Sequence, residues 1–108
     1  MGFGDKNIDI TKSVKIIEWL KSELLTSVAS LFELLAKGIH NSQDVILDII
    51  ANIILVTYLL GKRLGLSFDS IDAKVEEKAK LGLVEDHKIE KWYGDLSGVL
   101  DYFKRTRR

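Results

Sequence analysis

The chain has 108 residues, of which 46% are hydrophobic and 30% charged, a composition that fits one folded domain with a small core and excludes a disordered protein. Because 16 basic residues balance 16 acidic ones, no net charge would draw the chain to nucleic acid or to an anionic membrane surface. The absence of cysteine excludes disulfides, thiolate catalysis and thiolate zinc sites, and the absence of proline favours long helices. We therefore expect an all-α protein without a nucleic-acid partner.

The first ten residues, MGFGDKNIDI, hold two glycines and show no regular apolar spacing. We predict that they form a loose lead-in to a single helical domain that spans residues 1–108. They contain no cationic stretch followed by an apolar one, so we expect no signal peptide and a cytoplasmic protein.

A long amphipathic helix is predicted next, with Thr11 or Ser13 as its N-cap. It should end at Gly38, because glycine readily adopts the left-handed conformation that follows many helices. Its apolar residues recur every three or four positions and are Val14, Ile17, Leu20, Leu24, Val28, Leu31 and Leu35.

A second long helix is predicted from an N-cap at Ser42 to Gly65, and the short turn before it makes the two long helices an antiparallel hairpin. This helix is apolar almost all round, which suits either a membrane span or the central helix of a bundle. The apolar stretch from Val45 to Leu60 covers only about 24 Å of a hydrocarbon layer about 30 Å thick. Asp48 within that layer would cost about 2.5 to 3.5 kcal/mol. We therefore expect no membrane partner and predict a helical bundle that is completed by further copies, as a homodimer or homotetramer.

Two shorter amphipathic helices complete the predicted fold. The third begins near Ser67 or Asp69 and ends at Gly82. The fourth covers EDHKIEKWYGDLSGVLDYFKRTRR, with weak points at Gly94 and Gly98.

Polar residues interrupt the apolar faces of both long helices. Facing carboxylates on neighbouring helices can build a site for a hard cation, which makes four acids weak candidates for metal or nucleotide binding: Glu23, Glu33, Asp44 and Asp48. The alternative is structural, with Asp44 placed favourably at a helix N-terminus, Asp48 in solvent and small hydroxyl residues between closely packed helices. The two histidines, His40 and His87, form no zinc pattern and suit surface or capping roles.

Two segments carry a family resemblance. LTSVASL, residues 25–31, and DIIANI, residues 48–53, resemble the two acidic helix patterns of MazG-like proteins, a branch of the all-α nucleoside triphosphate pyrophosphohydrolases. The stretches YLLGKRLGL and VEEK also resemble that family, and EWLKSELL and EKWYGDLS resemble a subgroup of short members. The resemblance implies a helical fold in which acids bind magnesium, and the magnesium activates water against the phosphate chain of a nucleotide.

The same resemblance implies that the catalytic site is lost. The positions that match the four metal-binding acids hold Ser27, Ser30, Ile49 and Asn52, and only Asp48, which matches an accessory acid, remains. Hydroxyls and an amide do not supply the negative charge that holds magnesium, and Ile49 offers no oxygen.

Two functional hypotheses follow. The first is a catalytically degenerate member with no catalytic residue, metal or cofactor, which acts in interaction or regulation or binds a nucleotide weakly. The second is an active magnesium-dependent pyrophosphohydrolase that uses the relocated acids Glu23, Glu33, Asp44 and Asp48. The residues favour the first hypothesis.

Overall fold

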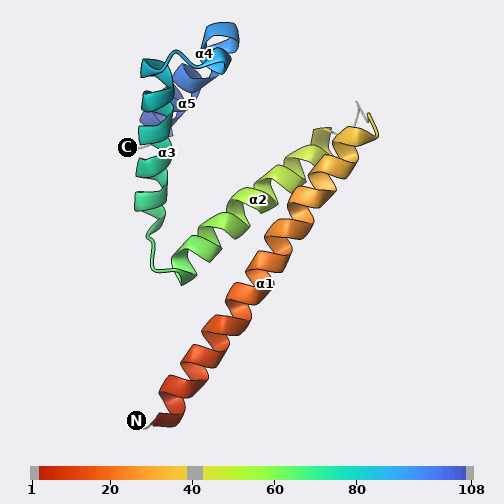
Figure 1. Ribbon diagram of the computed structural model, residues 1–108, viewed down its shortest axis with the longest axis vertical. Helices are drawn as coiled ribbons and strands as arrows, with labels where there is room; N and C mark the ends of the chain where they lie inside the picture. The colour runs from red at the N-terminus through yellow and green to blue at the C-terminus, as the bar shows by residue number, and fades with distance from the viewer. Residues whose placement is uncertain (1–2, 39–42, 107–108) are drawn as a thin grey trace. The chain divides into compact units, whose positions relative to one another are not determined.

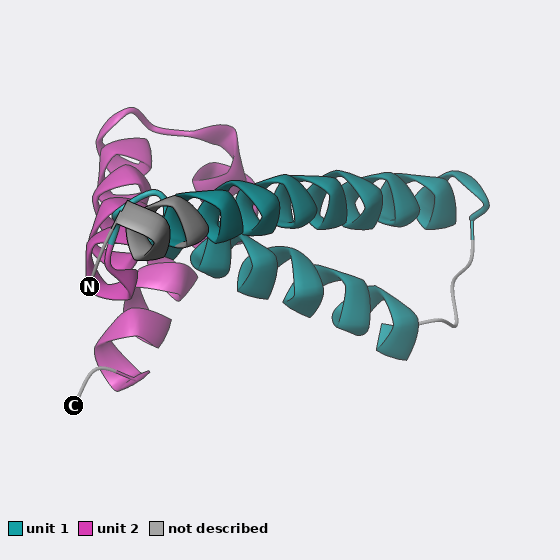
Figure 2. Ribbon diagram, turned by 90° about the horizontal axis from the view of Figure 1, so that it is seen from below, with its two compact units in different colours: residues 1–66 teal, residues 67–108 magenta. Residues whose placement is uncertain are grey.

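The computed structural model describes residues 3–38 and 43–106, which form helices without any strand, so the predicted all-α fold class is confirmed (Figure 1). The chain divides into two compact units, residues 1–66 and 67–108 (Figure 2). The first unit contains two helices and the second three: α1 (Phe3–Ala36), α2 (Gln43–Arg63), α3 (Phe68–Val84), α4 (Lys88–Tyr93) and α5 (Asp95–Thr106).

The first helix begins earlier than the sequence predicts. α1 starts at Phe3, so the predicted loose lead-in is wrong for residues 3–10, and neither Thr11 nor Ser13 is an N-cap. Glycine within a helix costs only about 1 kcal/mol, and this segment contains no proline that would end the helix. The first two residues of the chain lie outside the described part.

Glycines end both long helices as predicted. Gly38 and Gly65 have φ angles of 66° and 92°, in the left-handed region that glycine adopts without strain. After α2, the Leu66 N–H donates to the Gly61 carbonyl at 2.9 Å and the Gly65 N–H to the Lys62 carbonyl at 3.2 Å. These two bonds satisfy carbonyls that the helix end would otherwise leave unpaired. The predicted N-cap Ser42, and His40, lie outside the described residues.

α1 and α2 lie side by side within the first unit (Figures 1 and 2). They leave many large apolar side chains exposed. Leu20 and Val56, with exposed fractions of 2% and 3%, are the buried large apolar residues among those that the structure describes. By length and composition α2 is also the one helix in the described ranges that could cross a membrane, and only 11% of its apolar window is buried. The protein thus presents an apolar helix that this unit alone does not bury.

α3 has the predicted start but a different end. The Ser67 Oγ caps it by accepting from the Ser70 N–H at 3.1 Å. The predicted end at Gly82 is wrong, because the helix continues to Val84. Gly82 instead allows close packing with α5, since a Cβ atom there would lie 2.6 Å from the Leu96 Cδ1. A sequence cannot show that contact before the helices are placed.

Asp86, not a glycine, takes the left-handed conformation after α3, with φ of 62°. The His87 N–H donates to the Gly82 carbonyl at 3.0 Å and the Asp86 N–H to the Leu83 carbonyl at 3.2 Å, which is the Schellman pattern. Because side chains with a Cβ are strained in this region, we expect Asp86→Gly to raise the free energy of unfolding by about 0.5 to 1 kcal/mol. Urea denaturation measures it, with Asp86→Ala as the control that should lower stability. A less stable glycine variant would contradict this reading of the turn.

The predicted fourth helix is two helices. Gly94, with φ of 70°, ends α4, whereas Gly98 lies within α5. The His87 Nδ1 accepts from the Ile89 N–H at 3.1 Å and caps α4, the role that the sequence favoured over metal binding. Trp92 is 69% exposed, with the Lys88 ammonium 5.9 Å from its ring centroid, so this indole is not part of the core of its unit.

The Glu90 carboxylate caps the start of α5. It accepts from the Ser97 hydroxyl and from the Ser97 N–H, the latter at 2.9 Å. These hydrogen bonds, the one from the hydroxyl foremost, hold the pKa of Glu90 below its ordinary value.

A carboxylate with a lowered pKa stabilises the fold at pH values above its unfolded pKa, and this stabilisation is lost as the pH falls through the folded pKa. We therefore expect acid to weaken the capping of α5 below about pH 4.3, the ordinary pKa of glutamate. In thermal melts from pH 7 to 3, Glu90→Gln should show a smaller loss of melting temperature than the unchanged protein. Glu85→Gln, an exposed acid nearby without such bonds, is the control. Equal acid sensitivity in Glu90→Gln and the unchanged protein would contradict the assignment.

Candidate functional site

A pocket of about 330 Å³ lies between α1 and α2 and brings together the four positions at which the resemblance implies metal-binding acids. We call it the polar pocket. All four positions that match metal-binding acids line it, and Asp48 joins them. Its complete lining is Thr26, Ser27, Ser30, Asp48, Ile49, Ala51, Asn52 and Leu55. Residues 27 and 52, which lie on different helices, therefore belong to one site.

A hydrogen bond joins the two helices at the lining of this pocket. The Asn52 Nδ2 donates to the Ser27 Oγ at 2.7 Å, and both side chains are partly buried. Both residues are at positions where the resemblance described above implies a carboxylate. Two carboxylates there would repel each other unless a cation lay between them, whereas an amide and a hydroxyl satisfy each other directly.

Removing this hydrogen bond should weaken the packing of α1 against α2. We expect Asn52→Ala and Ser27→Ala each to lower the free energy of unfolding by about 0.5 to 1.5 kcal/mol, the usual net value of such a bond. The double variant should lose less than the sum, with a coupling energy of about 1 kcal/mol by urea denaturation. Thr57→Val is the control, because the Thr57 hydroxyl bonds the Ile53 carbonyl of its own helix at 2.6 Å and should show no coupling to Ser27. Strictly additive losses for Asn52 and Ser27 would show that the bond is absent in solution.

The donors in the polar pocket do not fit magnesium. Asp48 supplies the single carboxylate, Ser27 and Asn52 are engaged with each other, and Ile49 has no donor atom. Magnesium needs six near-octahedral oxygen ligands, so a single carboxylate would leave most of them to water or to substrate phosphates. In the described part of the chain, no three His, Asp or Glu side chains lie close enough together to hold a metal ion.

The structure does not gather the relocated acids of the second hypothesis around this pocket. Glu23, Glu33 and Asp44 are absent from its lining, and only Asp48 reaches it. Glu33 is exposed and pairs with Lys37 at 3.2 Å. Asp44 lies exposed in the first turn of α2, where a negative charge is favourable. Glu23 is half-buried on α1 and does not line the pocket.

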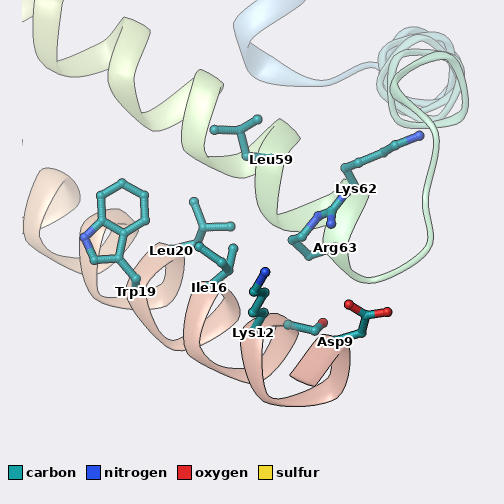
Figure 3. A pocket seen from close by; sticks show the side chains of 9 residues that line it. Asp9, Lys12, Ile16, Trp19, Leu20, Leu59, Lys62 and Arg63 are labelled. Atoms are coloured by element: carbon teal, nitrogen blue, oxygen red, sulfur yellow. The ribbon is translucent and has the colours of Figure 1, made fainter. Parts of the chain in front are cut away.

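A second, larger pocket of about 630 Å³ lies near the other end of the same two helices (Figure 3). We call it the cationic pocket, because three of its four charged side chains are positive. Figure 3 shows its charged side chains toward one end and its indole toward the other. Its lining is Asp9, Lys12, Ser13, Ile16, Trp19, Leu20, Leu59, Lys62 and Arg63. No sequence pattern predicted this pocket.

Most of the chain matches a family model. A model of the MazG-like family matches residues 10–96, which include both pockets' walls on α2 and part of each compact unit. No curated protein and no solved structure matches the chain.

Proposed function

Since this chain belongs to the MazG-like family, we propose that it is a catalytically degenerate member of the nucleoside triphosphate pyrophosphohydrolase superfamily. It forms a homo-oligomeric helical bundle and acts through interaction, regulation or weak nucleotide binding. The observation that carries this proposal is the polar pocket, where Ser27, Ser30, Ile49 and Asn52 come together around one carboxylate.

The chemistry of the pocket supports the loss of catalysis. A pyrophosphohydrolase of this family needs metal ions to neutralise the phosphate chain and to activate water. Asp48 provides one negative charge, whereas such a site needs several. The Asn52 amide and the Ser27 hydroxyl, which line the pocket from different helices, are hydrogen-bonded to each other. The remaining hydroxyls can contact a phosphate or a ribose, which is the basis for weak nucleotide binding.

The alternative remains an active enzyme with relocated carboxylates, and it requires Asp48 to recruit acids that now lie outside the pocket. Titration calorimetry with magnesium and with manganese separates the two. We expect no heat of binding at millimolar metal in the unchanged protein. A metal affinity that is lost in Asp48→Asn but kept in Asp69→Asn, an exposed acid on α3, would favour the enzyme.

We propose the bundle because a second copy of the chain would best cover the exposed apolar side chains of α1 and α2. Outside the cationic pocket, the structure leaves large apolar side chains exposed along both long helices: Ile10, Val14, Leu25, Phe32, Leu35, Val45, Leu47, Ile50, Ile54 and Leu55. A soluble monomer rarely exposes so large an apolar patch. The 21 residues of α2 give a length of about 31 Å, and two helices side by side are roughly 20 Å wide. This face is about the size of each partner's share of a standard interface, and a second pair of helices would complete a four-helix bundle.

Light scattering on a size-exclusion column tests the assembly. At micromolar concentration and without detergent, we expect the mass of a dimer or tetramer. Ile54→Glu places a charge on a residue that is 53% exposed in the single chain and should dissociate the assembly. Gln43→Glu adds the same charge at the polar start of α2 and should not. A stable monomer, or a protein that stays in solution only with detergent, would contradict the bundle, and the second result would favour a membrane role for α2.

A further inference from the structure

We propose that the cationic pocket binds an organic anion with an apolar body, such as an alkyl carboxylate. This inference is independent of the proposed function, because it concerns a different pocket and involves no metal or nucleotide. The volume of about 630 Å³ lies within the range of small-molecule sites. The pocket's two ends differ in chemistry, and each matches one part of such a ligand.

The apolar end provides a floor and a wall. Leu20, 2% exposed, is the most buried large side chain of the described part and lies at the bottom of the pocket, with Leu59 from α2 beside it. Trp19 is 57% exposed and lines the same end (Figure 3). The Trp19 indole is thus mostly in water beside an apolar concavity. The aliphatic or aromatic part of a ligand can cover this exposed apolar surface.

The charged end carries an excess of positive charge. Lys12, Lys62 and Arg63 are opposed within the lining by one acid, Asp9. Among the described residues, neither Lys12 nor Arg63 forms an ion pair or hydrogen bond through its side chain. Two exposed cations from different helices thus line the same pocket without a partner among the described residues. A guanidinium is suited to bind a carboxylate or a phosphate.

These cations are not needed to cap the end of α2. Backbone N–H groups already satisfy its last carbonyls, since Leu64 donates to Leu60 and Leu66 donates to Gly61. A second copy of the chain is also a poor occupant here, because a symmetric contact centred on this pocket would bring identical cations together. The charge of the pocket therefore favours an anion over another copy.

Titration calorimetry with octanoate tests the inference, with 1-octanol and octylammonium as neutral and cationic probes of the same chain length. We expect octanoate to bind about tenfold more tightly than 1-octanol, and octylammonium to bind least. Arg63→Gln and Lys12→Gln should each weaken octanoate about three- to fivefold without changing the affinity for 1-octanol. Lys15→Gln, which removes a cation of α1 outside the pocket, should have no effect.

Trp19→Ala should weaken octanoate and 1-octanol alike, and Trp19→Phe should restore most of the affinity, which locates the apolar body of the ligand. Equal affinities for the three probes, or octanoate binding that is unaffected by both Arg63→Gln and Lys12→Gln, would overturn the inference. Dissociation of an oligomer by octanoate would overturn it as well, because it would show that a second copy fills this pocket.

Discussion

Replacing Ser27, Ser30 and Ile49 by glutamate and Asn52 by aspartate is expected to create a magnesium site in the polar pocket, where we propose that the unchanged chain binds none. The four positions already line one pocket together with Asp48, so the backbone brings their Cβ atoms around a common space. Carboxylate number strongly affects the affinity of oxygen sites for hard cations. We expect magnesium to bind roughly a hundredfold or more tightly than to the unchanged chain, as measured by calorimetry.

Thermal melts provide a second measurement of the same variant. Five acids facing each other repel, so the metal-free variant should be less stable, and magnesium should recover its melting temperature. The control carries only Ser30→Glu and Ile49→Glu, keeps the Asn52–Ser27 hydrogen bond and should bind far more weakly. If the fourfold variant folds and binds no magnesium, the polar pocket is not the counterpart of the family's metal site.

Leu20→Ala is expected to cause the largest loss of stability of any single truncation in the first unit. Leu20 is 2% exposed, and this unit buries few other side chains so completely. Removing a buried leucine side chain to its Cβ usually lowers the free energy of unfolding by about 2 to 5 kcal/mol, through lost burial and the cavity that remains. Urea denaturation should show a loss in this range.

Leu20→Met, which conserves volume, should lose less than about 1.5 kcal/mol. An alanine variant as stable as the methionine variant would mean that Leu20 is not part of a packed core. The same pair also bears on the cationic pocket, since Leu20 forms its floor.

Local sequence signals predicted the helix ends that depend on backbone conformation alone. Gly38 and Gly65 are left-handed as predicted, because glycine is the residue that takes this conformation without strain. Gly82 misled the prediction, because its role is to admit Leu96 of α5, a contact between residues distant in sequence. Asp86 takes the left-handed position instead, and an aspartate does so too rarely for sequence to reveal it.

The start of α1 was missed for a different reason. Residues 3–10 contain no proline that would end the helix. Helix propensities of single residues differ too little to show at which residue the helix begins. Gly94 was predicted only as a weak point within one helix. A glycine inside a helix cannot be told from a glycine that ends one by residue type alone, so the break was not predicted.

The two pockets differ in how far sequence could predict them. The polar pocket follows from four-residue spacing on each long helix, together with the resemblance that aligned Ser27 and Asn52 with one site. The cationic pocket depends on register. Leu20 lies about two turns before Ser27 on α1, and Leu59 lies about two turns after Asn52 on α2. Because the helices are antiparallel here, the contact between Ser27 and Asn52 determines that Leu20 and Leu59 also meet. Without a known contact, Lys12 and Arg63 remain unrelated surface cations.

Release of pyrophosphate from a panel of nucleoside triphosphates, with magnesium or manganese present, tests the central proposal most directly. We expect no release above that of a blank without protein, for the unchanged chain and for Asp48→Ala alike. Metal-dependent release by the unchanged chain that Asp48→Ala abolishes and Asp69→Ala does not would contradict the loss of catalysis at the polar pocket.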